Sequence, residues 1–235
     1  MTVTLIGDFA DPLSFLASQR IAQIRSLGMH DVRWLAVEAD RSRPMGGRPV
    51  DETAAQTAER LLLPGEVGPM PGVLVPSSRA ATAAYAESVA DGVEDALRQS
   101  LFDALWLHGR NIADPDVLRS LVFAAHNPDP PAQPIEWRIR ANQPIVPLGD
   151  VDMFAVGRRL GLVASLGRGP LTRIGERRRD AWLHLWLHRG APELPLVLTD
   201  LGEAFAGETA LLWLADRLPQ GEAVDRRPRQ TVAAR

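Results

Sequence analysis

The chain has 235 residues and a formal net charge of −3, with 46% hydrophobic and 23% charged residues, a composition typical of a folded globular protein. It contains no cysteine, which excludes disulfides, thiolate nucleophiles and zinc sites built on sulfur. All 26 basic residues are arginine, which excludes Schiff-base chemistry, and the slightly acidic balance provides no positive field for nucleic acid. We therefore expect no nucleic-acid partner and no thiol–disulfide exchange by the chain's own side chains.

The first residues do not combine a basic segment with an apolar one, so the sequence predicts no signal peptide. No uninterrupted apolar segment reaches the roughly 18 residues that a membrane-spanning helix needs. We therefore expect a cytoplasmic protein without a membrane partner.

The first forty residues predict a β-α-β unit. Residues 3–6 are apolar and β-branched, as in a strand. Apolar residues then recur at three- and four-residue spacing up to Gly28, which predicts a helix. Residues 32–37 predict a second strand, so the two strands should be parallel and joined by a right-handed crossover.

The middle of the chain is predicted to be mainly helical. A predicted helix at 51–62 is flanked by loops rich in proline and glycine. An alanine-rich segment with a continuous apolar stripe predicts one long helix at 78–107. Asp114 followed by Pro115 is typical of a helix start and predicts a further helix to about residue 125.

The segment 126–149 is rich in proline and has no lasting periodicity. It predicts an irregular connection, with a short strand at 136–140, that is unusually long for a compact domain. Two helices are expected after it, at 151–160 and 174–189.

The last part of the chain predicts a hairpin and a helix. Residues 196–199 and 203–206 read as strands joined by a turn, and 207–218 as the final helix. Residues 219–235 are polar and rich in arginine, which predicts a disordered tail.

The predicted order of β-α-β, a helical block and β-β-α is that of an α/β thioredoxin-like fold with a large helical insertion. The core would consist of residues 1–40 and 190–218 with the helix at about 174–189, and residues 41–173 would form the insertion and the irregular connection. The length favours one core with an insertion over two full domains.

Three segments carry a family resemblance, and they read GDFADPLSFLASQRI at 7–21, SLFDALWLHGRNIADPDVLRSL at 100–121 and HRGAPELPLVLTDLGEAFAGETALLWLADRL at 188–218. They resemble the DsbA-like thioredoxin group, which includes 2-hydroxychromene-2-carboxylate isomerases and kappa-class glutathione transferases. The first segment is similar to the strand and active-site helix of that group. The second is similar to its acidic-aromatic helix and Asp-Pro cap, and the third to its approach to a cis-proline, last hairpin and helix. Residues 122–173 show no match.

The chain departs from this group at the start of the active-site helix. In the redox branch the helix begins Cys-x-x-Cys, and here those positions hold Asp11, Pro12, Leu13 and Ser14. The dithiol chemistry of that branch is therefore lost. In the glutathione-using branch the helix commonly begins Ser-Pro-x-Ser, with the first serine facing the thiol of glutathione. Asp11 in that place would repel a thiolate, which weakens the transferase interpretation.

Asp11 has two interpretations. Aspartate at the N-cap with proline at the first helical position is a strong helix start and needs no catalytic role. A helix start, with its unpaired N–H groups, is also a natural substrate site, which makes Asp11 a candidate catalytic group. Ser14 is likewise either an ordinary first-turn residue or catalytic. The cap is the simpler account, and it predicts that Asp11→Asn changes ligand binding little.

By the resemblance, Pro195 is a cis-proline that places the backbone of Leu194 against the start of the active-site helix. In the family this backbone edge binds an extended peptide or glutathione. The resemblance therefore implies a binding site that includes Pro12, Leu194 and Pro195, for a small molecule or a peptide. A cofactor, if the protein uses one, would be glutathione or another low-molecular-weight thiol.

Asp180, His184 and His188 are spaced four residues apart and share a face of a predicted helix. Two histidines at this spacing can hold zinc, but the metalloprotease signature needs glutamate where Leu185 stands. We interpret the three residues as a solvent-exposed stripe and predict no metal site. The three arginines at 177–179 have the same interpretation, with contact to an anionic ligand or partner as the alternative.

Three hypotheses follow for the function. In the first, a DsbA-like protein without its dithiol keeps the groove as a binding site. In the second, an isomerase or transferase uses Asp11 or Ser14, either directly or through a bound thiol. In the third, the protein is a structural partner subunit, with three tryptophans partly exposed at an interface: Trp182, Trp186 and Trp213. A homodimer is a further expectation that the sequence leaves open.

Overall fold

The computed structural model describes residues 2–28, 31–128 and 172–218. The elements in chain order begin with β1 (Val3–Gly7), α1 (Pro12–Ser26), β2 (Val32–Ala36), β3 (Arg48–Pro49), α2 (Glu52–Arg60) and β4 (Leu74–Val75). They continue with α3 (Arg79–Ser88), α4 (Glu94–Trp106), α5 (Pro115–His126), α8 (Arg173–His188), β5 (Leu196–Thr199), β6 (Ala204–Ala206) and α9 (Glu208–Ala215). The strand expected at 136–140, the helix expected at 151–160 and the tail at 219–235 lie outside the described residues.

Four strands form one mixed sheet in the order β2-β1-β5-β6. β1 is parallel to β2 and antiparallel to β5, and β5 is antiparallel to β6. Leu5 therefore lies between Trp34 of β2 and Val197 of β5. All of β5 and all of β1 except the half-buried Thr4 are buried, which explains their largely apolar sequences. The prediction that the two ends of the chain contribute to one mixed sheet is confirmed.

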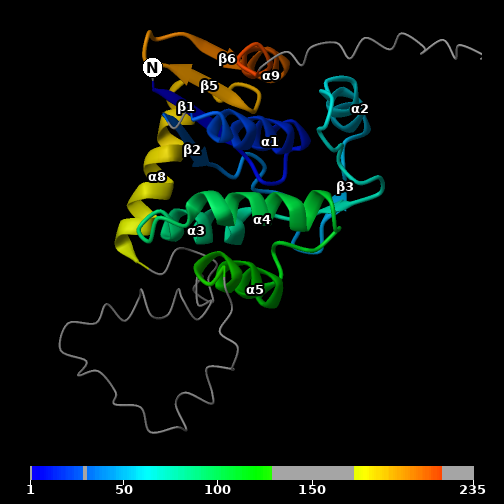
Figure 1. The fold of residues 1–235 in the computed structure, drawn as a ribbon. Helices are drawn as coiled ribbons and strands as arrows, with labels where there is room; N and C mark the ends of the chain where they lie inside the picture. Colours follow the sequence, from blue (N-terminus) through cyan, green and yellow to red (C-terminus); the bar gives the residue numbers. More distant parts are fainter. Residues whose placement is uncertain (1, 29–30, 129–171, 219–235) are drawn as a thin grey trace, which may run out of the picture.

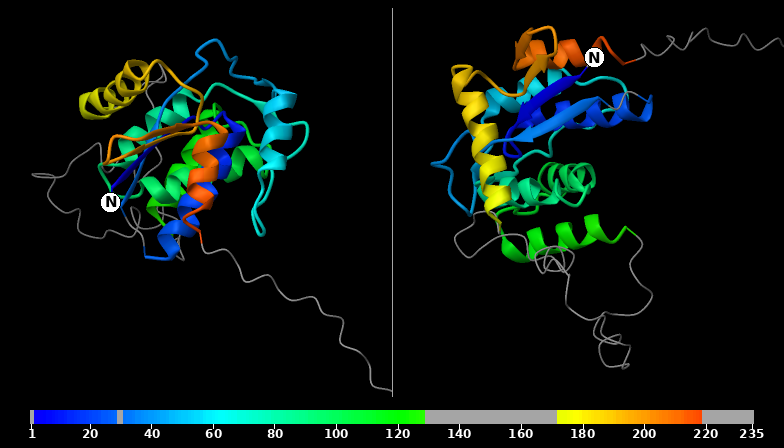
Figure 2. Two further views of the ribbon diagram at one scale, coloured as in Figure 1. Left: turned by 90° about the horizontal axis from the view of Figure 1, so that it is seen from above. Right: turned by 90° about the vertical axis from the view of Figure 1, so that its left-hand side faces the viewer.

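The helices cover both faces of this sheet. Figures 1 and 2 show α8 on one face and α1 with α9 on the other, while α3, α4 and α5 stack beyond β2. Trp106 of α4 is fully buried, and its indole Nε1 donates to the carbonyl oxygen of Phe9 at 3.0 Å. The stacked helices are therefore attached directly to the loop between β1 and α1.

The prediction of one continuous helix at 78–107 is wrong. The segment contains two helices, α3 and α4, separated by residues 89–93. Gly92 in this break has a φ of +69°, which glycine adopts without strain and which interrupts a helix. Both helices bury their apolar faces in the same core, so the apolar periodicity does not mark the break. The small sheet of β3 and β4 was also not predicted, because each strand has only two residues.

A buried ion pair holds α1 in place. Arg20 is 1% exposed, and its Nε lies 2.7 Å from Glu66 Oε1. Its terminal nitrogens also donate to the carbonyl oxygens of Leu211 at 2.6 Å and Leu61 at 2.5 Å. Because a buried guanidinium needs its donors paired, this cluster fixes α1 against α9 and against the segment 61–66.

The three tryptophans of the third hypothesis are buried rather than exposed at an interface. Trp182, Trp186 and Trp213 are 4%, 8% and 8% exposed. The ring of Trp182 packs against Tyr85 of α3, and that of Trp213 against Phe205 of β6. The hypothesis of an interface built on these three residues is therefore wrong, because their apolar surface is already covered within the chain.

The polar face of α8 is exposed to solvent at Asp180, His184 and His188, as the sequence predicts. In the part of the chain that the structure describes, no group of three or more histidine, aspartate or glutamate side chains is placed to hold a metal ion. Among the helices of that part, none has the length and hydropathy needed to cross a membrane.

Candidate functional site

Asp11 caps the start of α1, as the sequence predicts. Its backbone is extended, with φ −113° and ψ 124°, and Pro12 follows at the start of the helix. One carboxylate oxygen accepts from the N–H of Ser14 at 2.7 Å, and the other from the N–H of Leu13 at 3.4 Å. Two of the N–H groups that a helix start leaves unpaired are thereby satisfied.

Ser14 lies behind Asp11 and is fully buried. Its hydroxyl donates to Asp11 Oδ2 at 2.5 Å and accepts from the N–H of Asp8 at 3.3 Å. Gly7 leaves room for this arrangement, since a Cβ there would lie 2.5 Å from the ring of Trp34 and 3.0 Å from Ser14 Oγ. With its hydroxyl engaged on both sides, Ser14 orients the Asp11 carboxyl and does not itself face a ligand.

Asp11, Pro12 and Leu194 line one pocket of about 330 Å³, which we call the groove. Its other walls come from the segment 39–43, the start of α2, and the segment 191–193 that precedes the cis-proline. The structure thus brings together three of the residues that the sequence and its resemblance indicated.

Leu194 contributes an unpaired stretch of backbone to the groove. The peptide bond between Leu194 and Pro195 is cis. Pairing of β5 with β1 begins only at Leu196, and the carbonyl oxygen of Pro195 accepts from the N–H of Gly207 at 2.9 Å. Among the described residues, no hydrogen bond engages the backbone N–H or C=O of Leu194. A short backbone edge beside Asp11 is therefore free to pair.

The groove is acidic. Five carboxyl side chains line it, from Asp8, Asp11, Asp40, Asp51 and Glu193. Arg43 is the single cation among the described lining residues, and its Nε lies 3.8 Å from Asp40 Oδ2. Burial raises the pKa of Asp8 and Asp11, but protonation of these two still leaves three carboxylates against one arginine. This excess of negative charge favours a cationic or hydrogen-bond-donating ligand and disfavours an anion such as a thiolate.

Asp11 titrates near neutral pH. Burial raises its pKa, hydrogen bonds from Ser14 lower it and the charge of Asp8 raises it, and the resulting pKa is about 7. Burial also raises the pKa of Asp8, whose carboxylate accepts from the N–H groups of Ala10 at 2.9 Å and Ala39 at 2.8 Å. A carboxyl group that titrates near neutrality can donate or accept a proton, so Asp11 is both a helix cap and a candidate acid or base.

The sequence reasoning did not find most of the acidic residues of the groove. Asp40, Asp51 and Glu193 come from three segments that only the fold brings together. Asp8 carries a usable signal, because it directly follows β1, and ligands of α/β folds commonly bind beyond the carboxyl ends of strands. Asp51 offers no such signal, since it is also the cap of α2.

No protein-family model and no curated protein sequence matches the chain, but several solved structures do. A probable DsbA oxidoreductase from Streptomyces coelicolor has a TM-score of 0.58 at 15% identity, over 100% of this chain and 94% of that one. The cytosolic disulfide reductase DsbM from Pseudomonas aeruginosa, in a structure with GSH, has a TM-score of 0.54 at 17% identity. The match covers 92% of this chain and 95% of DsbM. A 2-hydroxychromene-2-carboxylate isomerase has a TM-score of 0.52 at 18% identity, over 92% of this chain and 93% of the isomerase.

The fold is thus the α/β thioredoxin-like fold of DsbA-like proteins, as the sequence predicts. Within that class, this chain has no cysteine and holds Asp11, Pro12, Leu13 and Ser14 at the start of α1. Thiol–disulfide exchange by its own side chains is excluded, because that reaction requires a thiolate.

Proposed function

We propose that the protein binds a small molecule or a peptide, without covalent chemistry, in the groove between the start of α1 and the cis-proline. The observation that carries this proposal is the unpaired backbone edge of Leu194 in the same pocket as the Asp11 carboxyl. An unpaired N–H and C=O beside a pocket can pair with an extended chain, as in strand addition to a sheet edge.

The charges of the groove indicate which occupant it favours. A peptide paired with Leu194 could place a cationic or amide group against the carboxyl of Asp11 or Glu193. The resemblance to DsbA-like proteins implies a peptide or glutathione at this edge, and the structure of DsbM contains GSH. Glutathione carries more carboxylate than ammonium charge, so the acidic groove favours a neutral or cationic peptide over it.

The test is a titration of isotope-labelled protein, followed by NMR, with acetyl-Ala-Arg-Ala-amide, its glutamate counterpart and reduced glutathione. We expect the arginine peptide to shift the amide signals of Ala10 and Leu194 saturably, and to bind about tenfold more tightly than the other two probes. Asp11→Asn should weaken this binding, because the variant removes a carboxylate from the groove.

The matched control is Asp114→Asn, which changes the cap of α5 outside the groove. This variant should bind the arginine peptide as the wild type does. The binding proposal fails if none of the three probes shifts the groove signals, or if Asp114→Asn weakens binding as much as Asp11→Asn.

A second candidate function is that of an isomerase or transferase in which Asp11 is the general acid or base. The observation that favours it is the pKa of about 7, which suits proton transfer at neutral pH. In this proposal Ser14 holds the Asp11 carboxyl in position, and the acidic groove gives a bound thiolate no support.

The isomerase proposal is tested with 2-hydroxychromene-2-carboxylate, an anion whose carboxylate would have to face Arg43 rather than the carboxyl groups of the groove. The protein is incubated with this substrate, with and without glutathione, and the absorbance of the substrate is followed. It predicts turnover without glutathione that is lost in Asp11→Asn and retained in Asp114→Asn. Turnover that survives Asp11→Asn would rule out the assigned role of Asp11.

A further inference from the structure

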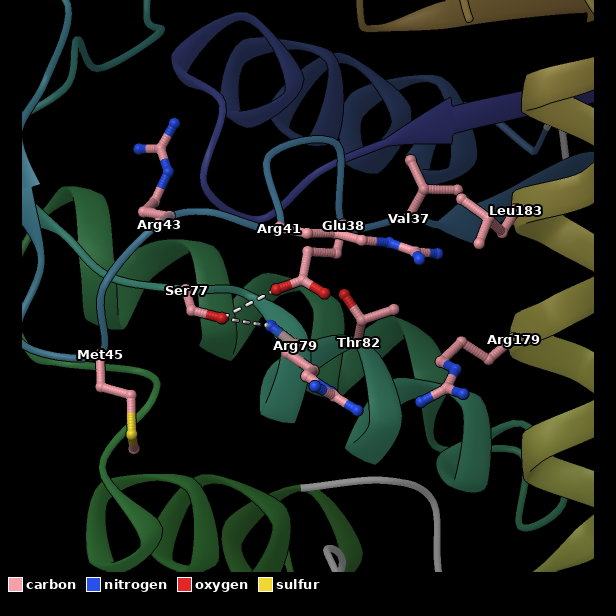
Figure 3. A pocket seen from close by; sticks show the side chains of 10 residues that line it. All are labelled: Val37, Glu38, Arg41, Arg43, Met45, Ser77, Arg79, Thr82, Arg179 and Leu183. Carbon is pink, nitrogen blue, oxygen red and sulfur yellow. Dashed lines mark hydrogen bonds between the residues drawn. The ribbon is translucent and has the colours of Figure 1, made fainter. Parts of the chain in front are cut away.

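A second pocket, of about 250 Å³, lies between the segment after β2, the start of α3 and α8 (Figure 3). Four arginines line it: Arg41, Arg43, Arg79 and Arg179. Glu38 is the single acidic residue among the described residues of its lining. We call this site the arginine pocket, and its net charge is the opposite of that of the groove.

The arginines of this pocket are incompletely paired. Arg43 is 3.8 Å from Asp40 and Arg179 is 3.1 Å from Asp180, and neither aspartate lines the arginine pocket. Within the described ranges, Arg41 and Arg79 form no ion pair. Figure 3 shows the side chains of Arg79 and Arg179 extending towards one another across the pocket from α3 and α8. Guanidinium groups that extend into the same pocket repel each other, and an anion between them would relieve that repulsion.

The start of α3 adds hydrogen-bond donors to the same place. Its cap residue Ser78 makes no side-chain cap hydrogen bond. The N–H of Arg79 donates to Ser77 Oγ at 3.3 Å, whereas the N–H groups of Ala80 and Ala81 have no partner among the described residues. These donors and the dipole of the ten-residue helix both favour negative charge at this end.

Thr82 gives an independent indication of a ligand. It is 1% exposed and lines the arginine pocket, and within the described part of the chain its hydroxyl has no hydrogen-bond partner. Figure 3 shows that hydroxyl turned into the pocket, towards Glu38. Buried hydroxyl groups are nearly always paired, because leaving one unpaired is costly. An oxygen acceptor in the pocket would satisfy it.

Glu38 does not fill this role. Its Oε1 accepts from Ser77 Oγ at 2.8 Å, which ties the carboxylate to the residues before α3. It forms no hydrogen bond with Thr82 and no ion pair with the arginines among the described residues. The lining of the pocket therefore retains an excess of positive charge.

We propose that the arginine pocket binds the oxyanion of a small organic ligand, either a carboxylate or a phosphate, between Arg79, Arg179 and the start of α3. The Thr82 hydroxyl donates to one of its oxygens. Arg43 lines both the arginine pocket and the groove, so the organic part of the ligand can extend towards Asp11. The anion site does not depend on the function proposed for the groove, because none of its contacts involves Asp11.

The test is calorimetric titration at low ionic strength with phenyl phosphate and with benzoate, two probes that differ in the anionic group. We expect saturable binding of at least one probe, weakened about tenfold in Arg179→Gln through loss of a charge-assisted contact. Arg177→Gln is the matched control, because Arg177 is exposed on the same helix and does not line the pocket. It should change the affinity by less than about twofold. Thr82→Val, which replaces only the hydroxyl with a methyl group, should also weaken binding.

Binding of phenyl phosphate alone or benzoate alone supports the site and identifies the anionic group that it takes. The proposal is overturned if neither probe binds saturably. It is also overturned if Arg177→Gln and Arg179→Gln weaken binding equally, because that result would mean general attraction to a basic surface.

Discussion

Two helices of this protein begin with the same dipeptide. α1 starts at Asp11-Pro12 and α5 at Asp114-Pro115, and in both the aspartate accepts from the backbone N–H groups two and three residues further on. Both caps follow from the local sequence, because aspartate and proline satisfy the geometry of a helix start wherever they occur.

The surroundings of the two helix starts differ. Asp114 is exposed, and the residue three positions after it is Val117, which has no hydroxyl. The corresponding residue after Asp11 is Ser14, whose hydroxyl donates to the Asp11 carboxylate. Asp11 also lies in the groove with Asp8. The same dipeptide therefore gives a plain cap at α5 and a titrating carboxyl in a pocket at α1, and the tertiary packing makes the difference.

The largest expected loss of folding stability comes from breaking the buried one of two ion pairs, each of which involves a residue of one of these helices or lies at its start. The Arg20–Glu66 pair is buried at both residues, whereas Arg119 and Asp116 at the start of α5 form an exposed pair at 3.0 Å. Glu66→Gln should lower the free energy of unfolding by about 3 kcal/mol, because it leaves a buried guanidinium unpaired. Asp116→Asn should lower it by about 0.5 kcal/mol or less. Urea unfolding of both variants measures the difference, and equal losses would show that the buried pair does not support α1.

The second prediction compares the two caps directly. Asp114→Ala should cost about 1 kcal/mol of stability, as is usual for a lost N-cap. Asp11→Ala should cost more, about 2 kcal/mol, because it also leaves the buried Ser14 hydroxyl without its acceptor. Asp11→Asn should lose only a few tenths of a kcal/mol, since an amide oxygen can still accept from the helix N–H groups. These values apply at acidic pH, where the Asp11 carboxyl is protonated, because at higher pH both Asp11 variants also remove the cost of ionising it. If urea unfolding gives the same loss for the two alanine variants, the Ser14 contact contributes nothing.

The third prediction concerns pH. The folded pKa of Asp11, about 7, lies above the ordinary value of 3.8, so the unfolded chain binds fewer protons between these two values. Stability should therefore be highest at the acidic end of this range and decrease as the pH rises to about 7. Asp11→Asn should reduce the decrease, and Asp8 and Asp103, whose pKa values burial also raises, contribute to what remains. Thermal unfolding across the range tests this, and an unchanged slope in the variant would contradict it.

The elements that the sequence predicts well are those with local causes. The strand at 3–6 and the start of α1 each follow from a few adjacent residues. The break between α3 and α4 was missed because the apolar stripe continues across it and only Gly92 marks it.

The other features that were missed, in the fold and in the site, depend on residues far apart in the chain. Glu66 is 46 positions from its partner Arg20, and Glu193 comes to the groove from beyond α8. The pKa of Asp11 depends on burial, which no local pattern encodes. The resemblance identified Asp11 and Leu194 as candidate site residues, whereas only the fold shows that several carboxyl groups gather in the groove.

The central claim is that Asp11 is more than a helix cap, because its carboxyl group lies in the groove and has a pKa of about 7. The most direct test is an NMR titration of the side-chain carboxyl carbon of Asp11 in isotope-labelled protein, with Asp11→Asn used to assign the signal. We predict a midpoint at pH about 7. A midpoint near the ordinary value of 3.8 would contradict the claim and leave Asp11 a cap alone.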